Sequence, residues 1–349
     1  MPSDSDLNVS SATDLSSSAS ANCYIVSNAG FYKFKTVKGN SSEFVGNVAS
    51  AAILWETFAT SETPECLDLI KAVDYENGYL AFQTAGTFKE GNAVIAAKDA
   101  SGNILWSWHI WLTDQPQGQV YYNDAGTMMD RNLGATSATP GDVAALGLLY
   151  QWGRKDPFLS GGSILSSTQA ESTITWPSAV SSNSSTGTIS YATANPTTFI
   201  TYNSSNYDWY YTGSSSTDNT RWTTSETNKS IYDPCPAGWR VPDGGLIGVW
   251  SKALDSPFTQ SSLYDSTNAG MNFSGRFGAD QTIWYPASGS HYYDDGSLYD
   301  VGGRCSYWSA SPCNYHAYGL YFYDYGSVDP SRDYRRTSGL SVRCLQVID

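Results

Sequence analysis

The stretch NAVIAAKDASGNILWSWHIW, residues 92–111, has the pattern of a β-hairpin. Two apolar-rich runs flank the segment Ala-Ser-Gly-Asn at 100–103, where the chain is expected to turn. Successive side chains of a strand point to opposite faces. One face of the second run therefore carries Ile104, Trp106, Trp108 and Ile110. This hairpin predicts an antiparallel β-sheet with a well-packed apolar face.

The sequence before this hairpin contains further short strands. YENGYLAFQTA, at 75–85, places Asn-Gly between apolar-rich runs, which is the strongest short-range indication of a hairpin. With the strand-like runs YIV, FYKFKTV and AAILWETF, it predicts an all-β sandwich over residues 21–113. Residues 1–20 are rich in Ser and Asp and predict a disordered lead-in. The polar, proline-containing residues 114–119 predict a linker.

The remaining residues, 120–349, predict a second domain of a different class. TPGDVAALGLLYQWGR, at 139–154, has a helical apolar pattern with Asp142 as its cap. VPDGGLIGVWSKALDSPF, at 241–258, predicts a second helix that Asp243 could cap. Two helices among many short strands indicate an α+β domain.

Composition excludes some classes of function. The net charge is −14 and the sequence pI is about 4.5, so the chain would repel a phosphate backbone, and we expect no nucleic-acid partner. The longest apolar run, at 104–112, is too short to cross a bilayer, and we expect no membrane span. The first residues lack the pattern of a signal peptide, which is expected if the chain is a mature or truncated form.

The six cysteines lack the spacing of a zinc site. An even number permits up to three disulfides in an exported protein, with 15 pairings for six cysteines. We favour a disulfide between Cys235 and Cys344. Free, mostly buried thiols are the alternative.

Five stretches in order resemble one bacterial family: MMDRNLGA (128–135), LYQWGRKDPF (149–158), YDPCPAGWRVPD (232–243), YWSAS (307–311) and GLSVRC (339–344). The second domain resembles the Fibrobacter succinogenes major paralogous domains, which are similar to C-type-lectin-like and formylglycine-generating-enzyme folds. The resemblance implies a C-type-lectin-like α+β domain that presents loops and a small sheet on one exposed face. The first domain resembles the β-sandwich modules of fimbrillin-like pilus-tip proteins from Bacteroidales.

The C-terminal part has an unusual composition. Between Gln281 and Gln346 there is no Lys, Glu, Gln or Met, although these types are common earlier in the chain. Mutation of the adenines in AAC codons gives NNC codons, which encode Tyr, Asp, Asn, Ser, Arg and Gly but none of those four types. The pattern resembles the variable region of a diversity-generating-retroelement target protein. Ordinary drift toward an aromatic, low-lysine surface is the alternative.

This pattern places a variable, ligand-binding face at residues 291–338. Tyr, Arg, Ser and Gly together resemble the composition of antibody binding loops, and Tyr and Arg are enriched at binding hot spots. Leu320, Phe322, Trp308 and Val342 are expected to form the scaffold. We expect the following side chains to be presented to a ligand: His291, Tyr292, Tyr293, Asp294, Asp295, Tyr299, Asp300, Arg304, Asn314, Tyr315, His316, Tyr321, Tyr323, Asp324, Tyr325, Asp329, Arg332, Asp333, Tyr334 and Arg335.

The sequence does not indicate an enzyme. His109 is expected to be structural, and the other two histidines and the cysteines Cys305 and Cys313 lie in the segment that varies. We therefore expect no catalytic residues and no cofactor. Asp294, Asp295 and Asp300 leave open a calcium site, although solvated loop carboxylates are the interpretation we favour.

Together these features predict a pilus-tip-like adhesin of the cell surface. It would bind a protein or glycan receptor through the variable face, and other pilus subunits through the β-sandwich. A phage tail receptor-binding protein with the same variable domain is one alternative. A structural pilin or stalk subunit without a specific ligand is another.

Overall fold

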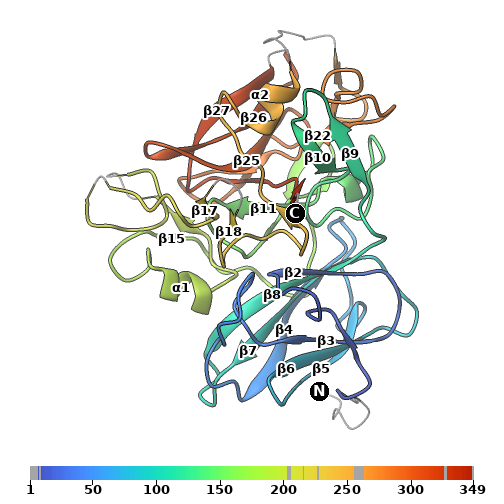
Figure 1. Ribbon diagram of the computed structural model, residues 1–349, viewed down its shortest axis with the longest axis vertical. Helices are drawn as coiled ribbons and strands as arrows, with labels where there is room; N and C mark the ends of the chain where they lie inside the picture. The colour runs from blue at the N-terminus through green and yellow to red at the C-terminus, as the bar shows by residue number, and fades with distance from the viewer. Residues whose placement is uncertain are drawn as a thin grey trace.

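The computed structural model describes residues 7, 9–202, 206–214, 216–225, 228–254, 263–325 and 328–347. Figure 1 shows two lobes, with the N-terminal strands (blue to cyan) in the lower lobe and the later strands (green to red) in the upper lobe. The α-helices within the described residues, α1 (Ile189–Ala194) and α2 (Val249–Ala253), are short, and strands form most of the regular structure. The protein is therefore β-rich.

The lower lobe contains two four-stranded sheets. The first has the order β1–β3–β6–β5, formed by Thr13–Asp14, Phe31–Lys35, Tyr79–Thr84 and Ile70–Glu76. The second has the order β2–β8–β7–β4, formed by Cys23–Val26, Ile104–Leu112, Gly91–Lys98 and Ser50–Thr57. The hairpin predicted at 92–111 is present as the antiparallel pair β7 and β8. One hydrophobic cluster joins the sheets, with Phe34 and Phe82 from the first and Ile95, Trp108 and Ile110 from the second.

Strand β8 is buried along both faces, which explains its nearly continuous apolar run. Trp108 packs against Phe34 of the first sheet, with 5.1 Å between ring centroids. On the opposite face, the Ser107 hydroxyl donates to Asp156 of the upper lobe at 2.6 Å. Trp111 Nε1 donates to a carbonyl oxygen of the upper lobe at 3.1 Å. The strand thus belongs to both lobes.

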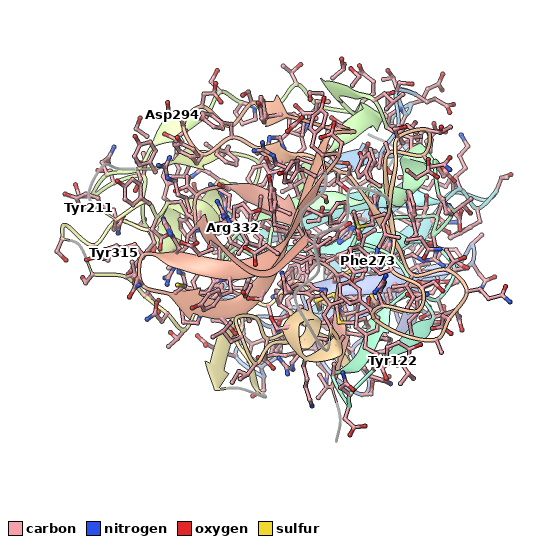
Figure 2. The ribbon with its side chains drawn as sticks, turned by 90° about the horizontal axis from the view of Figure 1, so that it is seen from above. Tyr122, Tyr211, Phe273, Asp294, Tyr315 and Arg332 are labelled. Carbon is pink, nitrogen blue, oxygen red and sulfur yellow. A yellow bond between two sulfur atoms is a disulfide. The ribbon has the colours of Figure 1, made fainter. Side chains whose placement is uncertain are left out.

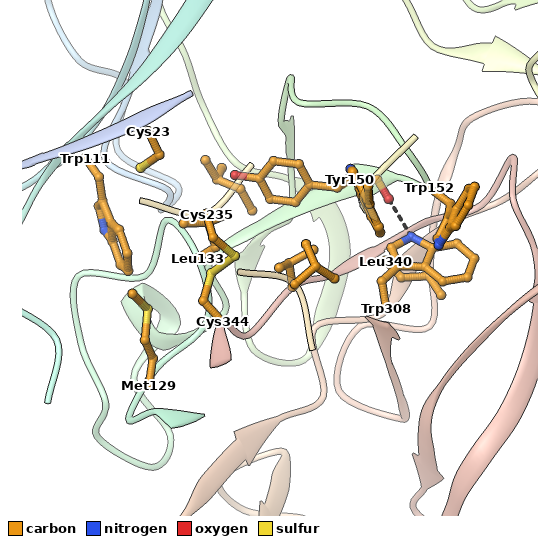
Figure 3. Packing of buried hydrophobic residues seen from close by; sticks show 14 of the residues in the cluster. Cys23, Trp111, Met129, Leu133, Tyr150, Trp152, Cys235, Trp308, Leu340 and Cys344 are labelled. Atoms are coloured by element: carbon orange, nitrogen blue, oxygen red, sulfur yellow. Dashed lines mark hydrogen bonds between the residues drawn. A yellow bond between two sulfur atoms is a disulfide. The ribbon is translucent and has the colours of Figure 1, made fainter. Parts of the chain in front are cut away.

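The two lobes share one hydrophobic core (Figure 3). Cys23 and Trp111 of the lower lobe lie in the same buried cluster as Met129, Leu133 and the Trp-rich centre of the upper lobe. The Asn22 amide adds polar contacts, because it donates to two carbonyl oxygens of the segment 231–233 at 2.7 and 2.9 Å. The lobes are therefore joined by packing as well as by the chain.

The upper lobe is built around one large sheet. Its main order is β12–β11–β28–β25–β26–β27, formed by Phe158–Leu159, Leu148–Gln151, Gly339–Ser341, Arg304–Cys313, His316–Tyr323 and Val328–Arg335. Two short strands extend it beside β28: β23 (Ser290–His291) and β24 (Leu298–Tyr299). The chain reaches this sheet from distant parts of the sequence, which places residues 148–159 and 290–341 side by side.

Small sheets surround the large one. The first has the order β19–β29–β10–β9, formed by Trp239–Arg240, Leu345–Gln346, Gly126–Met129 and Gly118–Tyr121. A three-stranded sheet contains β20 (Tyr264–Asp265), β21 (Gly270–Asn272) and β22 (Trp284–Pro286). Three strand pairs complete the lobe: β13 (Gly161–Ser163) with β14 (Ser166–Gln169), β15 (Val180–Ser181) with β16 (Ile200–Thr201), and β17 (Thr223–Ser225) with β18 (Asn228–Lys229).

The helix predicted at 139–154 is wrong. Asp142 does cap a turn, and its side chain accepts from the Ala144 amide, but only the 3₁₀ turn η1 (Val143–Ala145) forms. Gly147 then adopts a φ of +72°, and strand β11 begins at Leu148 and pairs with β28. Sheet pairing here overrides local helical preference.

The second predicted helix, at 241–258, is shorter than expected. Helix α2 spans Val249–Ala253, and its N-cap is Gly248 instead of Asp243. The Asp243 carboxylate pairs with Arg240 at 2.6 Å. Residues 255–258 of the predicted helix lie outside the described residues. Within the part of the chain that the structure describes, no helix has the length and apolar character to cross a bilayer.

The structure also differs from prediction at the expected domain boundaries. Residues 9–20 are not a disordered lead-in, because β1 pairs in parallel with β3 and the Val9 and Ala12 side chains are buried. The last two residues of the expected linker at 114–119 belong to a strand, since β9 begins at Gly118. Asp114, at its start, is paired with Arg131 of the upper lobe. The buried Val9 and Ala12 side chains explain the order of residues 9–20. The ion pair of Asp114 with Arg131 explains why the segment 114–119 is not a free linker.

The favoured disulfide, Cys235–Cys344, is present and closes a sequence separation of 109 residues. It joins the segments that lead into the paired strands β19 and β29. The other four cysteines are free thiols, of which Cys23 and Cys305 are buried, Cys313 is half-buried and Cys66 is exposed.

Candidate functional site

The strands β25, β26 and β27 form one end of the large sheet, with one face inward and one face outward. Leu320 and Phe322 are fully buried on the inner face, as expected for scaffold residues. Trp308 and Val342 are also fully buried, but in the cluster shared with the lower lobe, and Trp308, which pairs with Gly319, points to the other side of the sheet from Leu320. Along β26 the partly exposed side chains are His316, Tyr318, Tyr321 and Tyr323. Strand β26 pairs regularly with β25 from Gly319 to Tyr323, so Gly319 lies on the same side as Tyr321 and Tyr323, as the period-2 pattern predicts. Gly319 is buried there, beside the Tyr334 ring.

Rings and guanidinium groups cover the outer face of this sheet. Tyr321 stacks on Tyr323 with 5.5 Å between ring centroids. Arg304 and Arg332 approach the Tyr321 ring at 5.8 and 5.9 Å. Tyr334 completes the group, 6.1 Å from Tyr321 in an edge-on arrangement. Cation–π contacts of this kind hold the arginines in place while their N–H groups stay available to a partner.

A second group surrounds Arg335 at the end of β27. Its guanidinium lies 3.9 Å from the centroid of Tyr293, 4.8 Å from Tyr207 and 5.9 Å from Tyr202. His316 lies beside this cage, 5.9 Å from the Tyr207 ring. Three tyrosines from two distant segments thus enclose one cation.

The two groups are continuous. Tyr299 contacts Arg304 of the first group at 6.0 Å, and it contacts Tyr292 at 6.3 Å. Tyr292 in turn contacts Tyr293 of the second group, with 4.3 Å between ring centroids. We call the connected set the tyrosine–arginine face: Tyr202, Tyr207, Tyr292, Tyr293, Tyr299, Arg304, His316, Tyr321, Tyr323, Arg332, Tyr334 and Arg335.

The view from above shows where this face lies (Figure 2). Asp294, Tyr315 and Arg332 lie over the part of the molecule that contains β25 to β27, whereas Phe273 and Tyr122 lie toward the other side. The three predicted segments, 291–300, 313–316 and 321–335, therefore meet on one side of the upper lobe.

A buried polar network supports this face from below. Arg336 follows the caged Arg335 but is fully buried, and its guanidinium lies 4.3 Å from the Trp152 ring centroid. It donates to the His316 and Asn314 carbonyl oxygens at 2.9 and 3.1 Å, which fixes the hairpin between β26 and β25. The same group lies 3.6 Å from the buried carboxylate of Asp208. A charge buried with this many partners is costly to leave unpaired, so the network specifies the position of the hairpin.

The predicted binding residues fall into three classes of exposure. Nine side chains are exposed: Tyr292, Asp294, Asp295, Tyr299, Asn314, Tyr315, Tyr325, Arg332 and Asp333. Ten are half-buried: Tyr293, Asp300, Arg304, His316, Tyr321, Tyr323, Asp324, Asp329, Tyr334 and Arg335. Residues 326–327 of the predicted variable face lie outside the described residues.

His291 is the exception, and its placement on the binding face is wrong. Its side chain is buried, with Nδ1 2.8 Å from the Gly296 carbonyl oxygen and Nε2 2.8 Å from the Leu159 carbonyl oxygen. Burial lowers the pKa of the His291 imidazole. The residue ties the loop 292–297 to the sheet and is not part of the tyrosine–arginine face.

Two phenols of the face are held by the protein itself. The Ser306 hydroxyl and the Tyr334 hydroxyl are 2.8 Å apart, and Tyr334 is the most enclosed ring of the set. Burial raises the pKa of the Tyr321 phenol and of the Tyr334 phenol. Both phenols therefore stay protonated at neutral pH and remain hydrogen-bond donors.

Sequence reasoning missed Tyr202 and Tyr207. Both belong to the Ser/Thr/Asn-rich insertion and stack on each other at 5.8 Å beside Arg335. The only indication was the presence of aromatic residues within a polar stretch.

The carboxylates of the loop 294–300 do not gather into a metal site. Asp295 accepts from the Ser297 amide at 2.8 Å, and Asp300 pairs with Arg304 at 3.2 Å. Across the described ranges, no group of three or more His, Cys, Asp or Glu side chains is arranged to hold a metal ion. Asp333 is also paired within the protein, 2.6 Å from His316 Nδ1.

Comparisons with protein-family models, with curated proteins and with solved structures find no match for this chain.

Proposed function

We propose that this protein is a non-enzymatic, pilus-tip-like adhesin of the cell surface. The tyrosine–arginine face would bind a protein or glycan receptor. In this proposal the lower lobe is a fimbrillin-like β-sandwich, and the upper lobe is a C-type-lectin-like domain of the diversity-generating-retroelement type.

One observation carries the proposal: twelve aromatic and basic side chains from four distant segments converge on one side of the upper lobe. Tyrosine supplies a large amphipathic contact area and loses little conformational entropy on binding. The arginines are oriented by ring contacts, so a partner would not have to order them. A face of this kind suits an interface of standard size, roughly 800 Å² per partner.

An apolar groove in the lower lobe supports the proposal that this lobe attaches to other pilus subunits. The groove has a volume of about 520 Å³ and lies between β4 and β5, which are edge strands of the two sheets. Ile53, Leu54 and Val73 line it. Such a groove would suit a subunit contact on the side of the molecule that does not carry the tyrosine–arginine face.

A binding screen tests the proposal. The chain is applied to protein and glycan arrays, and each ligand found is titrated against a triple variant, Tyr321→Ala, Tyr323→Ala and Arg332→Ala. Hot-spot residues contribute about 2 kcal/mol or more each, so we expect at least a hundredfold loss of affinity. Tyr122→Ala is the matched control, because Tyr122 is an exposed tyrosine outside the face, and it should bind as the parent does.

Unchanged binding by the triple variant would contradict the proposal and favour a stalk subunit. The retroelement part has a separate test, which is the sequence of the neighbouring DNA. We expect a reverse transcriptase and a template copy of residues 291–344 that differs from the coding copy only at adenines. Differences at other bases would leave drift as the explanation. Neighbouring tail genes would favour the phage receptor-binding protein.

A further inference from the structure

A groove of about 310 Å³ lies beside the tyrosine–arginine face, on the side of the loop 295–297. Its walls come from three parts of the upper lobe: the segment 176–179, the segment 197–199 and the loop 295–297, with Phe158 and Gln169 between them. Asp294, next to this loop, is labelled at the upper left of Figure 2. The volume of the groove is at the lower end of the range for small-molecule pockets, about 300–1,000 Å³.

Aromatic rings form the floor of this groove. Phe158 contacts Phe199 at 5.4 Å and Trp176 at 6.0 Å. The fourth ring of the floor is that of His291, whose centroid lies 5.6 Å from the Phe199 centroid. The half-buried Trp176 is oriented from behind, because its Nε1 donates to the Ser172 hydroxyl at 3.0 Å. The indole is therefore held in place before any ligand arrives.

Polar groups form the rim. The Asp295 Oδ1 accepts from the Ser297 amide at 2.8 Å and from the Ser297 hydroxyl at 2.7 Å, and this fixes the carboxylate at the edge of the groove. The half-buried Gln169 presents an amide from the end of β14, and Ser178 and Thr197 add hydroxyl groups. No Lys or Arg is among the described residues that line the groove.

We infer that this groove binds a pyranose ring of a neutral glycan. A pyranose has an apolar face of C–H groups, which fits against an indole, and a rim of hydroxyls, which pairs with carboxylate, amide and hydroxyl groups. A phosphate or a sialic acid does not fit, because the Asp295 carboxylate would repel it and no cation in the lining would offset the repulsion. A purely apolar ligand does not fit either, because it would cover the Asp295 carboxylate and the Gln169 amide with groups that cannot hydrogen-bond to them.

This site is separate from the binding proposed for the tyrosine–arginine face, although Asp295 belongs to the segment 291–338 in which the sequence predicts binding residues. The groove would hold a sugar ring whether or not the face is occupied. Its polar contacts come partly from residues 169–199, which lie outside the segment that varies.

The test uses the full chain labelled with 5-fluorotryptophan and followed by fluorine NMR. Neutral oligosaccharides of glucose, galactose and mannose are titrated, and the Trp176 resonance is assigned with Trp176→Phe. We expect a saturable shift of that resonance with at least one of them. Gln169→Ala should weaken binding by about five- to tenfold, the loss expected for about one hydrogen bond.

The control is Tyr122→Ala, at an exposed residue that lines neither the groove nor the tyrosine–arginine face, and it should leave the affinity for the neutral sugar unchanged. Absence of a Trp176 shift with every neutral sugar would overturn the inference, as would unchanged affinity in Gln169→Ala. A sugar whose binding falls in the triple variant of the face, but not in Gln169→Ala, would also overturn it. That last result would leave the proposed function of the face standing.

Discussion

Two neighbouring arginines have opposite environments in this protein. Arg335 is half-buried and is held in a cage of tyrosines at the surface, whereas Arg336 is fully buried against Trp152. Desolvation lowers the pKa of Arg336 to about 10, yet it remains charged at neutral pH and is paired with Asp208. The sequence could not distinguish the two residues, because the burial of Arg336 depends on contacts with the distant segment 208–219.

This difference predicts unequal effects on stability. Arg336→Met should lower the free energy of unfolding by about 3 kcal/mol, because it leaves buried carbonyl oxygens and the Asp208 carboxylate with fewer partners. Arg335→Met is the matched control and should cost less than about 1 kcal/mol, since its contacts are partly solvated. Urea unfolding of the two variants measures both values. Equal losses would show that Arg336 does not have the anchoring role described above.

At the scale of the elements, the strands of the large sheet show how much of the site the sequence could predict. The alternation along β26 correctly separated the buried Leu320 and Phe322 from the outward Tyr321 and Tyr323. It also correctly placed Gly319 on the side of Tyr321, where the Tyr334 ring lies 3.7 Å from the position that a Cβ would take. The alternation could not predict the contribution of Tyr202 and Tyr207, because a loop has no periodicity from which to infer its neighbours.

The Cys235–Cys344 disulfide allows a prediction at the same scale. Replacing both cysteines by Ala should lower the free energy of unfolding by roughly 2–5 kcal/mol, because the bond closes a long loop in the unfolded chain. Cys66→Ala, at an exposed free thiol, is the control and should change it by less than about 0.5 kcal/mol. Urea unfolding under non-reducing conditions compares the variants. A double variant as stable as the parent would contradict the expected role of the bond.

The whole molecule is more unified than its sequence suggests. Composition and the polar residues 114–119 predict two domains with a linker, but the lobes share a buried cluster. The buried ion pair of Lys155 and Asp156 in the upper lobe also contacts the lower lobe, because Lys155 donates to the Ser107 carbonyl oxygen at 2.9 Å and Asp156 accepts from the Ser107 hydroxyl at 2.6 Å. The face of β8 that meets the upper lobe carries Ser107 and Trp111. The residues that cover it lie far along the chain, so the sequence alone could not identify them.

A shared core predicts a single unfolding event. Calorimetry should show one transition for the two lobes, and Lys155→Met should lower its stability by about 3 kcal/mol without splitting it, because Asp156 is left buried. Lys89→Met, which removes the exposed pair with Asp68, should leave the transition temperature nearly unchanged, because water screens an exposed pair. Two separate transitions in the parent chain would show that the lobes are independent.

The position of Asn22 and Trp111 between the lobes has a mechanical consequence. If the lower lobe were fastened to a filament and the upper lobe to a host surface, a pulling force would cross the seam formed by the Asn22 amide and the rings around Trp111. A flexible tether would stretch first and let the tip swivel. This seam would instead transmit tension directly, so the orientation of the tip would follow that of its filament.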